Sequence, residues 1–363
     1  MRLCHDVAQM HRLLLATRRA RRTISPHHSD SPVTAMTGND LVEVRANPFP
    51  SGMSSVTHSS DSSESTKSPD LKLSRPFEEV HHTGNRSPRL ALHQMTTYRW
   101  DLTREIREIR SAGCQAIGLW RNKLDDDELT AAELEEDGLA VSSLSWSGFF
   151  TGSHGMTFDE AVADAREAVS QARTLGAETL VIYSGARAGH TLTHARRLTA
   201  WGLRAVADFA AEQGVQLALC PLSALGRRWS FLHGLDPALE VLDIVRHPNV
   251  GLACDLYHLW LSESRMELRI DEIASRTRLV HVSDGPATPS HEYDQSLPGK
   301  GRVPVNEWVR RFSAAGYQGY YEVQCWSESV WRTMSGAQLG WLMHDLRSAA
   351  LAPAEQAART SLH

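Results

Sequence analysis

The chain has 363 residues and a formal net charge of −5. This charge argues against a general nucleic-acid-binding protein, and no apolar run approaches the roughly 20 residues that span a bilayer. Five scattered cysteines without a CxxC pair predict reduced thiols in a cytoplasmic protein with neither membrane nor nucleic-acid partners.

Residues 1–88 differ in composition from the rest of the chain. They hold 14 serines and 7 of the 15 prolines, but only two of the 25 aromatic residues. Such a segment cannot bury enough apolar surface to offset its conformational entropy, so we predict a disordered, low-complexity extension. Its first 24 residues carry six arginines and one acid. They are typical of a targeting peptide or a basic arm, or else precede a later start at Met36 or Met53.

From residue 89 onward, short apolar runs alternate with amphipathic segments. Each run is rich in Val, Ile, Leu and aromatic residues, as buried parallel strands are. We predict eight strands, at residues 90–95, 116–120, 140–146, 179–184, 216–222, 250–256, 279–283 and 320–326.

Capping signals place helices between these runs. Thr157 and Glu160 form a capping box, and Gly176 ends the helix that they begin. Further helices are predicted over 191–213, from Asp236 onward and over 306–315. Eight strand–helix repeats predict an α/β protein with a single (β/α)8 TIM barrel over residues 89–349, followed by a tail over 350–363. A doubly wound sheet is the alternative, although no Gly-rich phosphate motif follows the first strand.

Three of the later strands carry polar residues in apolar surroundings: Asp255, His281 and Glu322. A buried carboxylate is costly unless it is paired or binds a cation. With His258 three residues after Asp255, the pattern indicates one divalent metal ion, either Mn, Mg, Co or Zn. The alternative is a hydrogen-bonded network without a metal.

Around these residues the sequence resembles the xylose isomerase-like barrels, and among them the sugar phosphate isomerase/epimerase family. The resemblance covers about residues 90–335. It rests on Met95-Thr96-Thr97-Tyr98-Arg99-Trp100, Gly118-Leu119-Trp120-Arg121, Val141-Ser142-Ser143-Leu144, Asp255-x-x-His258, His281-x-x-Asp284 and Gly316-Tyr317-x-Gly319-Tyr320-Tyr321-Glu322-Val323.

The resemblance implies a sugar or sugar phosphate as substrate, a possible homo-oligomer, and proton abstraction next to a carbonyl through an enediolate. It implies that Asp255, His281 and Glu322 bind the metal, that Glu322 is catalytic and that His258 contacts substrate. The apurinic-site endonucleases share these residues. The extra zinc-binding histidines that they need are missing after the fourth and seventh strands.

The resemblance breaks at the fifth strand, where the family has Glu-Pro and this chain has Cys220-Pro221. We predict Cys220 as a fourth metal ligand and a second catalytic residue. A thiolate ligand would favour Zn, but a thiol is a poorer proton carrier near neutral pH. Three interpretations stay open: an active isomerase or epimerase, a lyase such as an inosose dehydratase, or an impaired barrel that binds a sugar-like ligand or partner.

Other residues near the strand ends suggest substrate contacts. Trp120 and Trp146 are predicted to bind substrate through their flat apolar faces, although core packing explains them equally well. Arg227-Arg228-Trp229 either closes over an anionic substrate or forms an exposed loop with one packed Trp. Gly299-Lys300-Gly301 forms either a phosphate cradle or a tight turn.

Overall fold

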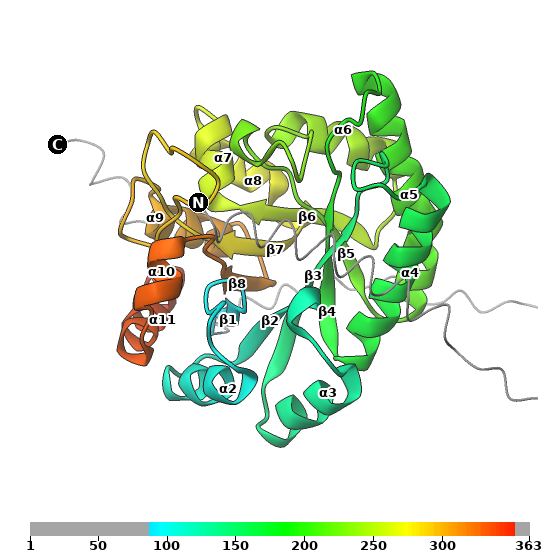
Figure 1. Ribbon diagram of the computed structural model, residues 1–363. Helices are drawn as coiled ribbons and strands as arrows, with labels where there is room; N and C mark the ends of the chain where they lie inside the picture. The colour runs from blue at the N-terminus through cyan, green and yellow to red at the C-terminus, as the bar shows by residue number, and fades with distance from the viewer. Residues whose placement is uncertain (1–86, 353–363) are drawn as a thin grey trace, which may run out of the picture. The chain divides into compact units, whose positions relative to one another are not determined.

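The computed structural model of the protein describes residues 87–352 (Figure 1). The predictions for the disordered extension, the targeting peptide, the alternative starts and most of the C-terminal tail lie outside these residues. In residues 87–352, no helix is both long and apolar enough to cross a membrane.

Eight parallel strands close into one barrel in chain order, because β1 pairs with β8 as well as with β2. This closure confirms the predicted (β/α)8 fold and excludes the open doubly wound sheet. The strands are β1 (Arg89–His93), β2 (Ala116–Trp120), β3 (Ala140–Gly148), β4 (Ala177–Tyr183), β5 (Gln216–Leu219), β6 (Val250–Asp255), β7 (Thr277–Val282) and β8 (Tyr320–Val323).

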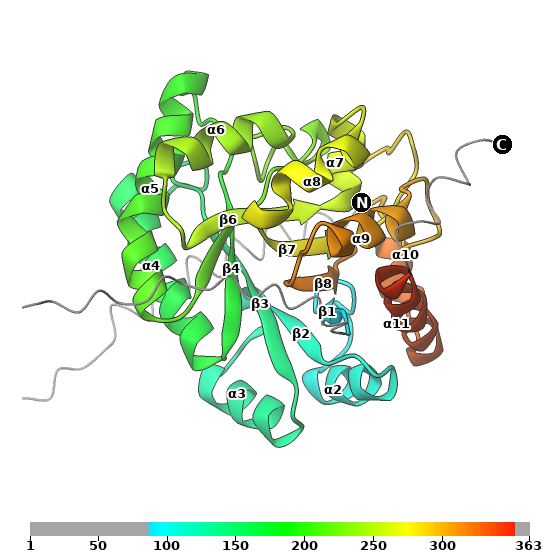
Figure 2. The ribbon, with the colours of Figure 1, turned by 180° about the vertical axis from the view of Figure 1, so that it is seen from behind.

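Helices surround the barrel on its outside (Figures 1 and 2). The last helix packs against α9 and α2 and so joins the two ends of the outer layer. It ends two residues beyond the predicted barrel boundary at residue 349. The helices are α2 (Leu102–Ser111), α3 (Asp127–Glu136), α4 (Phe158–Thr174), α5 (Leu192–Glu212), α6 (Leu235–Val245), α7 (Leu256–Ser262), α8 (Ile270–Ile273), α9 (Val305–Ala314), α10 (Glu328–Thr333) and α11 (Gly336–Leu351).

Local signals set the ends of α4 and α5 where the sequence predicts them. Thr157 and Glu160 form the predicted capping box of α4: each side chain accepts a hydrogen bond from the other residue's backbone N–H. Gly176 follows α4 with φ +70°, a left-handed conformation that glycine adopts at little cost. Thr191 caps α5 by accepting the His194 N–H, without a reciprocal bond. These caps fix where the chain enters α4, where it leaves α4 for β4, and where it enters α5.

The strand register places three predicted site residues side by side. Asp255 on β6 pairs with His281 on β7, and His281 pairs with Glu322 on β8. Register partners in parallel strands point to the same face of a sheet, and each of these side chains is at most 3% exposed. The three side chains therefore face the barrel interior, toward the ends of their strands.

Gly118 on β2 leaves the space that the Glu322 carboxyl group fills. An added Cβ would lie 2.5 Å from Glu322 Cδ and 2.7 Å from His93 Cδ2. Overpacking of this kind costs about 1–3 kcal/mol, so we expect Gly118→Ala to lower the free energy of unfolding in urea by that amount. Gly340→Ala in α11 is the control, because no atom lies within 4 Å of its added Cβ. Equal stabilities for the two variants would contradict the tight contact.

Candidate active site

The carboxylate of Glu322 is the centre of a buried polar cluster. Ser142 Oγ donates a hydrogen bond to Oε2 at 2.5 Å, and Ser143 Oγ lies 2.8 and 3.1 Å from the two oxygens. His281 Nε2 lies 3.3 Å from Oε1. Burial raises the pKa of Glu322, but the neighbouring His281 and His93 rings and the Ser142 hydroxyl outweigh it and lower this pKa to about 2. Glu322 is therefore ionised at neutral pH.

A β-bulge lets two consecutive serines reach the same carboxylate. Ile117 pairs with Val141 but Gly118 pairs with Ser143, so Ser142 is an extra residue on β3. In a regular strand, consecutive side chains point to opposite faces, whereas a bulge redirects one of them. Ser142 and Ser143 therefore both point toward Glu322.

Two histidines flank Glu322, with ring centroids 6.3 Å apart. His93 Nδ1 accepts the Met95 N–H at 3.0 Å. Burial lowers the pKa of His93 to about 4, so the neutral ring carries its proton on Nε2. Among the described residues, neither this Nε2 nor either nitrogen of His281 has a hydrogen-bond partner, because the 3.3 Å contact to Glu322 is poorly aligned.

Gln324 adds a third unpartnered side chain. It lies two residues beyond Glu322, is 1% exposed, and neither its amide oxygen nor its nitrogen finds a partner in residues 87–352. Buried polar atoms in folded proteins are nearly always hydrogen-bonded. Such a concentration of unpartnered groups inside one barrel indicates a place for a polar ligand.

Asp255 ends β6 and caps α7. Its Oδ1 accepts the His258 N–H and the Ser283 hydroxyl, both at 3.1 Å. His258 Nδ1 lies 3.0 Å from Ser223 Oγ, and burial lowers the pKa of this ring. His258 is therefore a neutral, oriented imidazole beside the Asp255 carboxylate.

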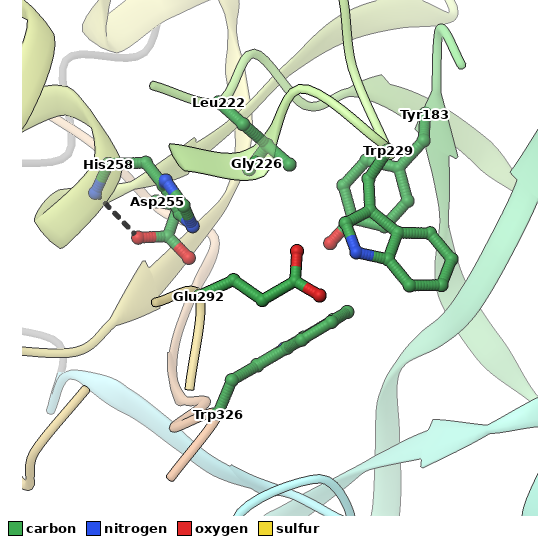
Figure 3. A pocket seen from close by; sticks show the side chains of 8 residues that line it. All are labelled: Tyr183, Leu222, Gly226, Trp229, Asp255, His258, Glu292 and Trp326. Atoms are coloured by element: carbon green, nitrogen blue, oxygen red, sulfur yellow. Dashed lines mark hydrogen bonds between the residues drawn. The ribbon is translucent and has the colours of Figure 1, made fainter. Parts of the chain in front are cut away.

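A pocket lies above these residues, between the loops that follow β5 and β7 (Figure 3). The Glu292 carboxylate points into it, between Trp326 and the pair formed by Trp229 and Tyr183. No Lys or Arg from residues 87–352 lines it. The lining residues are Tyr183, Leu222, Gly226, Trp229, Asp255, His258, Glu292 and Trp326.

The aromatic walls of the pocket continue into the core. Trp146 lies 5.3 Å from both Trp229 and Trp326, measured between ring centroids, and Trp120 lies 6.0 Å from Trp146. Trp120 and Trp146, the predicted substrate-binding residues, are thus buried behind the pocket and do not line it. Trp229 and Trp326 occupy the lining positions instead, and Trp229 is the packed residue of its loop.

Cys220 follows β5 and is completely buried. Its Sγ donates to the Pro221 carbonyl at 3.8 Å, and the thiol is not among the pocket-lining groups. Burial, together with the charges of Asp255 and Cys254, raises the pKa of Cys220 well above its usual value. The four cysteines in residues 87–352 are all buried free thiols, as predicted.

The donor set at Asp255, His281 and Glu322 suits a divalent metal. Two carboxylates and an imidazole are common ligands, and both His281 nitrogens lack hydrogen bonds. Within the described range, however, no group of three or more His, Cys, Asp or Glu side chains is placed to hold an ion. Both oxygens of Glu322 and Oδ1 of Asp255 are hydrogen-bonded to neighbouring serines. The residues fit a metal by type and register, but their side chains do not converge on one point.

The Gly299-Lys300-Gly301 segment is a tight turn held by Asp284. Asp284 Oδ2 accepts the N–H groups of Gly299 and Gly301 at 3.1 and 2.8 Å, and Oδ1 accepts those of Gly285 and Val303 at 2.8 Å each. Asp284 therefore occupies the backbone groups that a phosphate would need.

The chain matches the family model described as xylose isomerase-like TIM barrel over residues 106–351. It belongs to this family. The resemblance in its motifs is thereby confirmed.

Similar proteins include sugar epimerases. Over 219 residues, the chain is 28% identical to a ketose 3-epimerase from Arthrobacter globiformis, covering 56% of this chain and 70% of that protein. Over 149 residues, it is 26% identical to a fructoselysine 3-epimerase from Escherichia coli O157:H7, covering 38% and 52% respectively. The solved structure of a protein from Sinorhizobium meliloti 1021 has a TM-score of 0.66 and 25% identity, over 73% of this chain and 99% of that one.

Three features of the candidate site in this xylose isomerase-like barrel were not predicted from the sequence. His93 is a polar residue in an apolar strand, the same signal that identified Glu322. Ser142 and Ser143 both reach Glu322 because β3 has a bulge there, and the alternation of residues along a strand does not predict a bulge. Glu292 lies in a loop whose path only the folded chain defines.

Ionised Glu322 makes the stability of this barrel depend on pH. Its pKa falls from 4.5 to about 2 on folding, so its stabilising contribution is complete above 4.5 and is lost as the pH falls toward 2. The loss amounts to at most about 3 kcal/mol. In urea unfolding with chelator present, the stability advantage of wild type over Glu322→Gln should shrink between about pH 6 and about pH 3. A constant difference would contradict the lowered pKa.

Proposed function

We propose that this protein is a divalent-metal-dependent sugar isomerase or epimerase that abstracts a proton next to a carbonyl. The observation that carries the proposal is the inward-facing row of Asp255, His281 and Glu322, with the unpartnered Gln324 beside it. The names of the two similar epimerases support a sugar as the substrate.

Each part of the site has a role in such a reaction. Glu322, which is ionised and accepts hydrogen bonds from Ser142 and Ser143, is the base that takes the proton. A metal held by Asp255, His281 and Glu322 would stabilise the negative charge that develops on the substrate oxygens.

The surrounding side chains bind the sugar and exclude water. Neutral His258 and the Gln324 amide offer hydrogen bonds to hydroxyl groups. Trp229 and Trp326 cover the apolar side of the sugar ring or chain.

We further propose that the substrate carries no phosphate. Among the described residues, the pocket lining contains two carboxylates, Asp255 and Glu292, and no Lys or Arg, although Arg228 beside it is ion-paired with Glu292. Phosphate sites use basic side chains or free backbone N–H groups, and those of Gly299 and Gly301 bind Asp284. A neutral sugar avoids the repulsion that a phosphate would meet here.

A barrel that binds a sugar without turnover is the second candidate. It is favoured by the replacement of a carboxylate by Cys220 at the end of β5 and by the burial of that thiol outside the pocket. Solvent exchange at carbon separates the two functions, because binding alone moves no proton.

Metal content tests the first part of the proposal. Protein purified without chelator should contain close to one equivalent of a divalent metal by elemental analysis, and His281→Ala should lose most of it because one of the three ligands is gone. Glu240→Gln, an exposed site on α6, is the control. Less than about one tenth of an equivalent, not restored by Mn or Zn, would contradict the metal site.

Turnover tests the reaction and the substrate class. Ketoses incubated with the enzyme in D2O should take up deuterium next to the carbonyl, as observed by NMR. We expect a phosphorylated ketose to react with a kcat/KM at least about tenfold below that of the free sugar. A repulsion of about 1.4 kcal/mol between the phosphate and the pocket carboxylates is enough to produce a tenfold difference. A faster reaction of the phosphate ester would contradict the uncharged substrate.

A further inference from the structure

Inversion of a carbon centre requires two proton-transfer groups, one on each face of the substrate. One group removes the proton, and the other delivers a proton to the opposite face. The reaction proposed above assigns Glu322 to one face only. Resting on that proposed function, we infer that Glu292, in the loop between β7 and α9, is the second catalytic residue.

Glu292 lines the pocket through a side chain that is only 10% exposed. Figure 3 shows its carboxylate reaching toward the middle of the pocket, with Trp326 on one side and Trp229 on the other. Asp255 belongs to the same lining. Glu292 thus enters the pocket from a loop at the mouth, whereas Glu322 is buried in the barrel interior on β8 and is not one of the residues that line the pocket.

The carboxylate is held at one oxygen. Arg228 Nη1, from the loop after β5, donates to Glu292 Oε1 at 3.2 Å. Oε2 makes no hydrogen bond or ion pair with residues 87–352. One oxygen therefore fixes the orientation, and the other is available to carry a proton.

The backbone around Glu292 is also fixed. Asp294 Oδ2 accepts the N–H groups of Ser290 and His291 at 2.6 and 3.3 Å, which closes a turn around Glu292. Asp284 ties down the two ends of the longer loop through four backbone N–H groups. Such preorganisation keeps a catalytic group near its reactive position.

The other acid–base groups of the pocket are less suited to this role. Asp255 Oδ1 caps α7, and His258 Nδ1 is engaged by Ser223. Burial raises the pKa of Tyr183 well above its usual value, so its phenol stays protonated. Cys220, at the strand end where a carboxylate was expected, donates its thiol to the Pro221 carbonyl.

The proposed step conserves protons and electrons. The Glu322 carboxylate takes the proton from the carbon next to the carbonyl. The C–H electron pair forms the carbon–carbon double bond of the enediolate, and the carbonyl electrons move to oxygen. Glu292, which takes up a proton from solvent during turnover, then gives that proton to the opposite face of that carbon, and the carbonyl re-forms. Exchange with solvent returns a proton to Glu292 and removes one from Glu322; the reverse reaction exchanges the two roles.

The test follows each epimer of an active ketose separately in D2O by NMR. Wild type should invert both epimers and introduce deuterium at the inverted carbon. We expect Glu292→Gln to slow inversion by about 10²- to 10⁴-fold, the usual contribution of one acid–base residue. The variant should still exchange the proton of the epimer that faces Glu322. Glu322→Gln should show the reverse selectivity, which a purely structural defect would not produce.

Two further variants control for folding and charge. Glu292→Asp keeps a carboxylate on a shorter side chain and should recover part of the inversion rate, whereas Glu240→Gln should leave it unchanged. Inversion by Glu292→Gln within threefold of wild type, or loss of exchange with both epimers in a folded variant, would overturn the role of Glu292. No exchange by wild type with any ketose would instead reject the proposed function, and this inference with it.

Discussion

The site depends on one constraint: an ionised carboxylate, Glu322, buried inside a closed barrel. Moving such a charge out of water is unfavourable unless fixed dipoles replace the lost hydration. The neighbouring strands meet this requirement, because β3 bulges to supply two hydroxyl groups and β1 and β7 supply histidines. β2 contributes only a glycine, which leaves room for the carboxyl group. The part of the barrel interior beside β8 is therefore shaped around the Glu322 carboxylate.

The candidate site combines a rigid floor with a loop-built mouth. Asp255, His281 and Glu322 belong to strands whose register is set by the closed sheet. The mouth is formed by loops, but Asp284 fastens one of them to the strand ends by four hydrogen bonds. Specificity in (β/α)8 proteins lies in such loops. Here the loops contribute aromatic faces and the Glu292 carboxylate, which is paired with Arg228.

Much of the fold and part of the site followed from the sequence. Buried parallel strands are continuous apolar runs, so all eight strands were predictable from the sequence. A carboxylate within such a run, as at Glu322, is an unusual residue and therefore indicates a site. His93 is a weaker signal, because an apolar strand tolerates a neutral imidazole more easily than a carboxylate. Trp146 and Trp229 look alike in sequence, and only packing decides which of them lines the pocket. Glu292 has no local signal, because its position depends on hydrogen bonds across a long loop.

The cluster of Trp146, Trp229 and Trp326 has an optical consequence. Its three ring centroids lie 5.3 to 5.5 Å apart, close enough for the indoles to exchange excitation energy. Their shared near-ultraviolet signal therefore responds to any displacement of a single ring. Since two of these rings line the pocket and the third supports them, the protein carries an intrinsic spectroscopic reporter of occupancy at the mouth of its barrel.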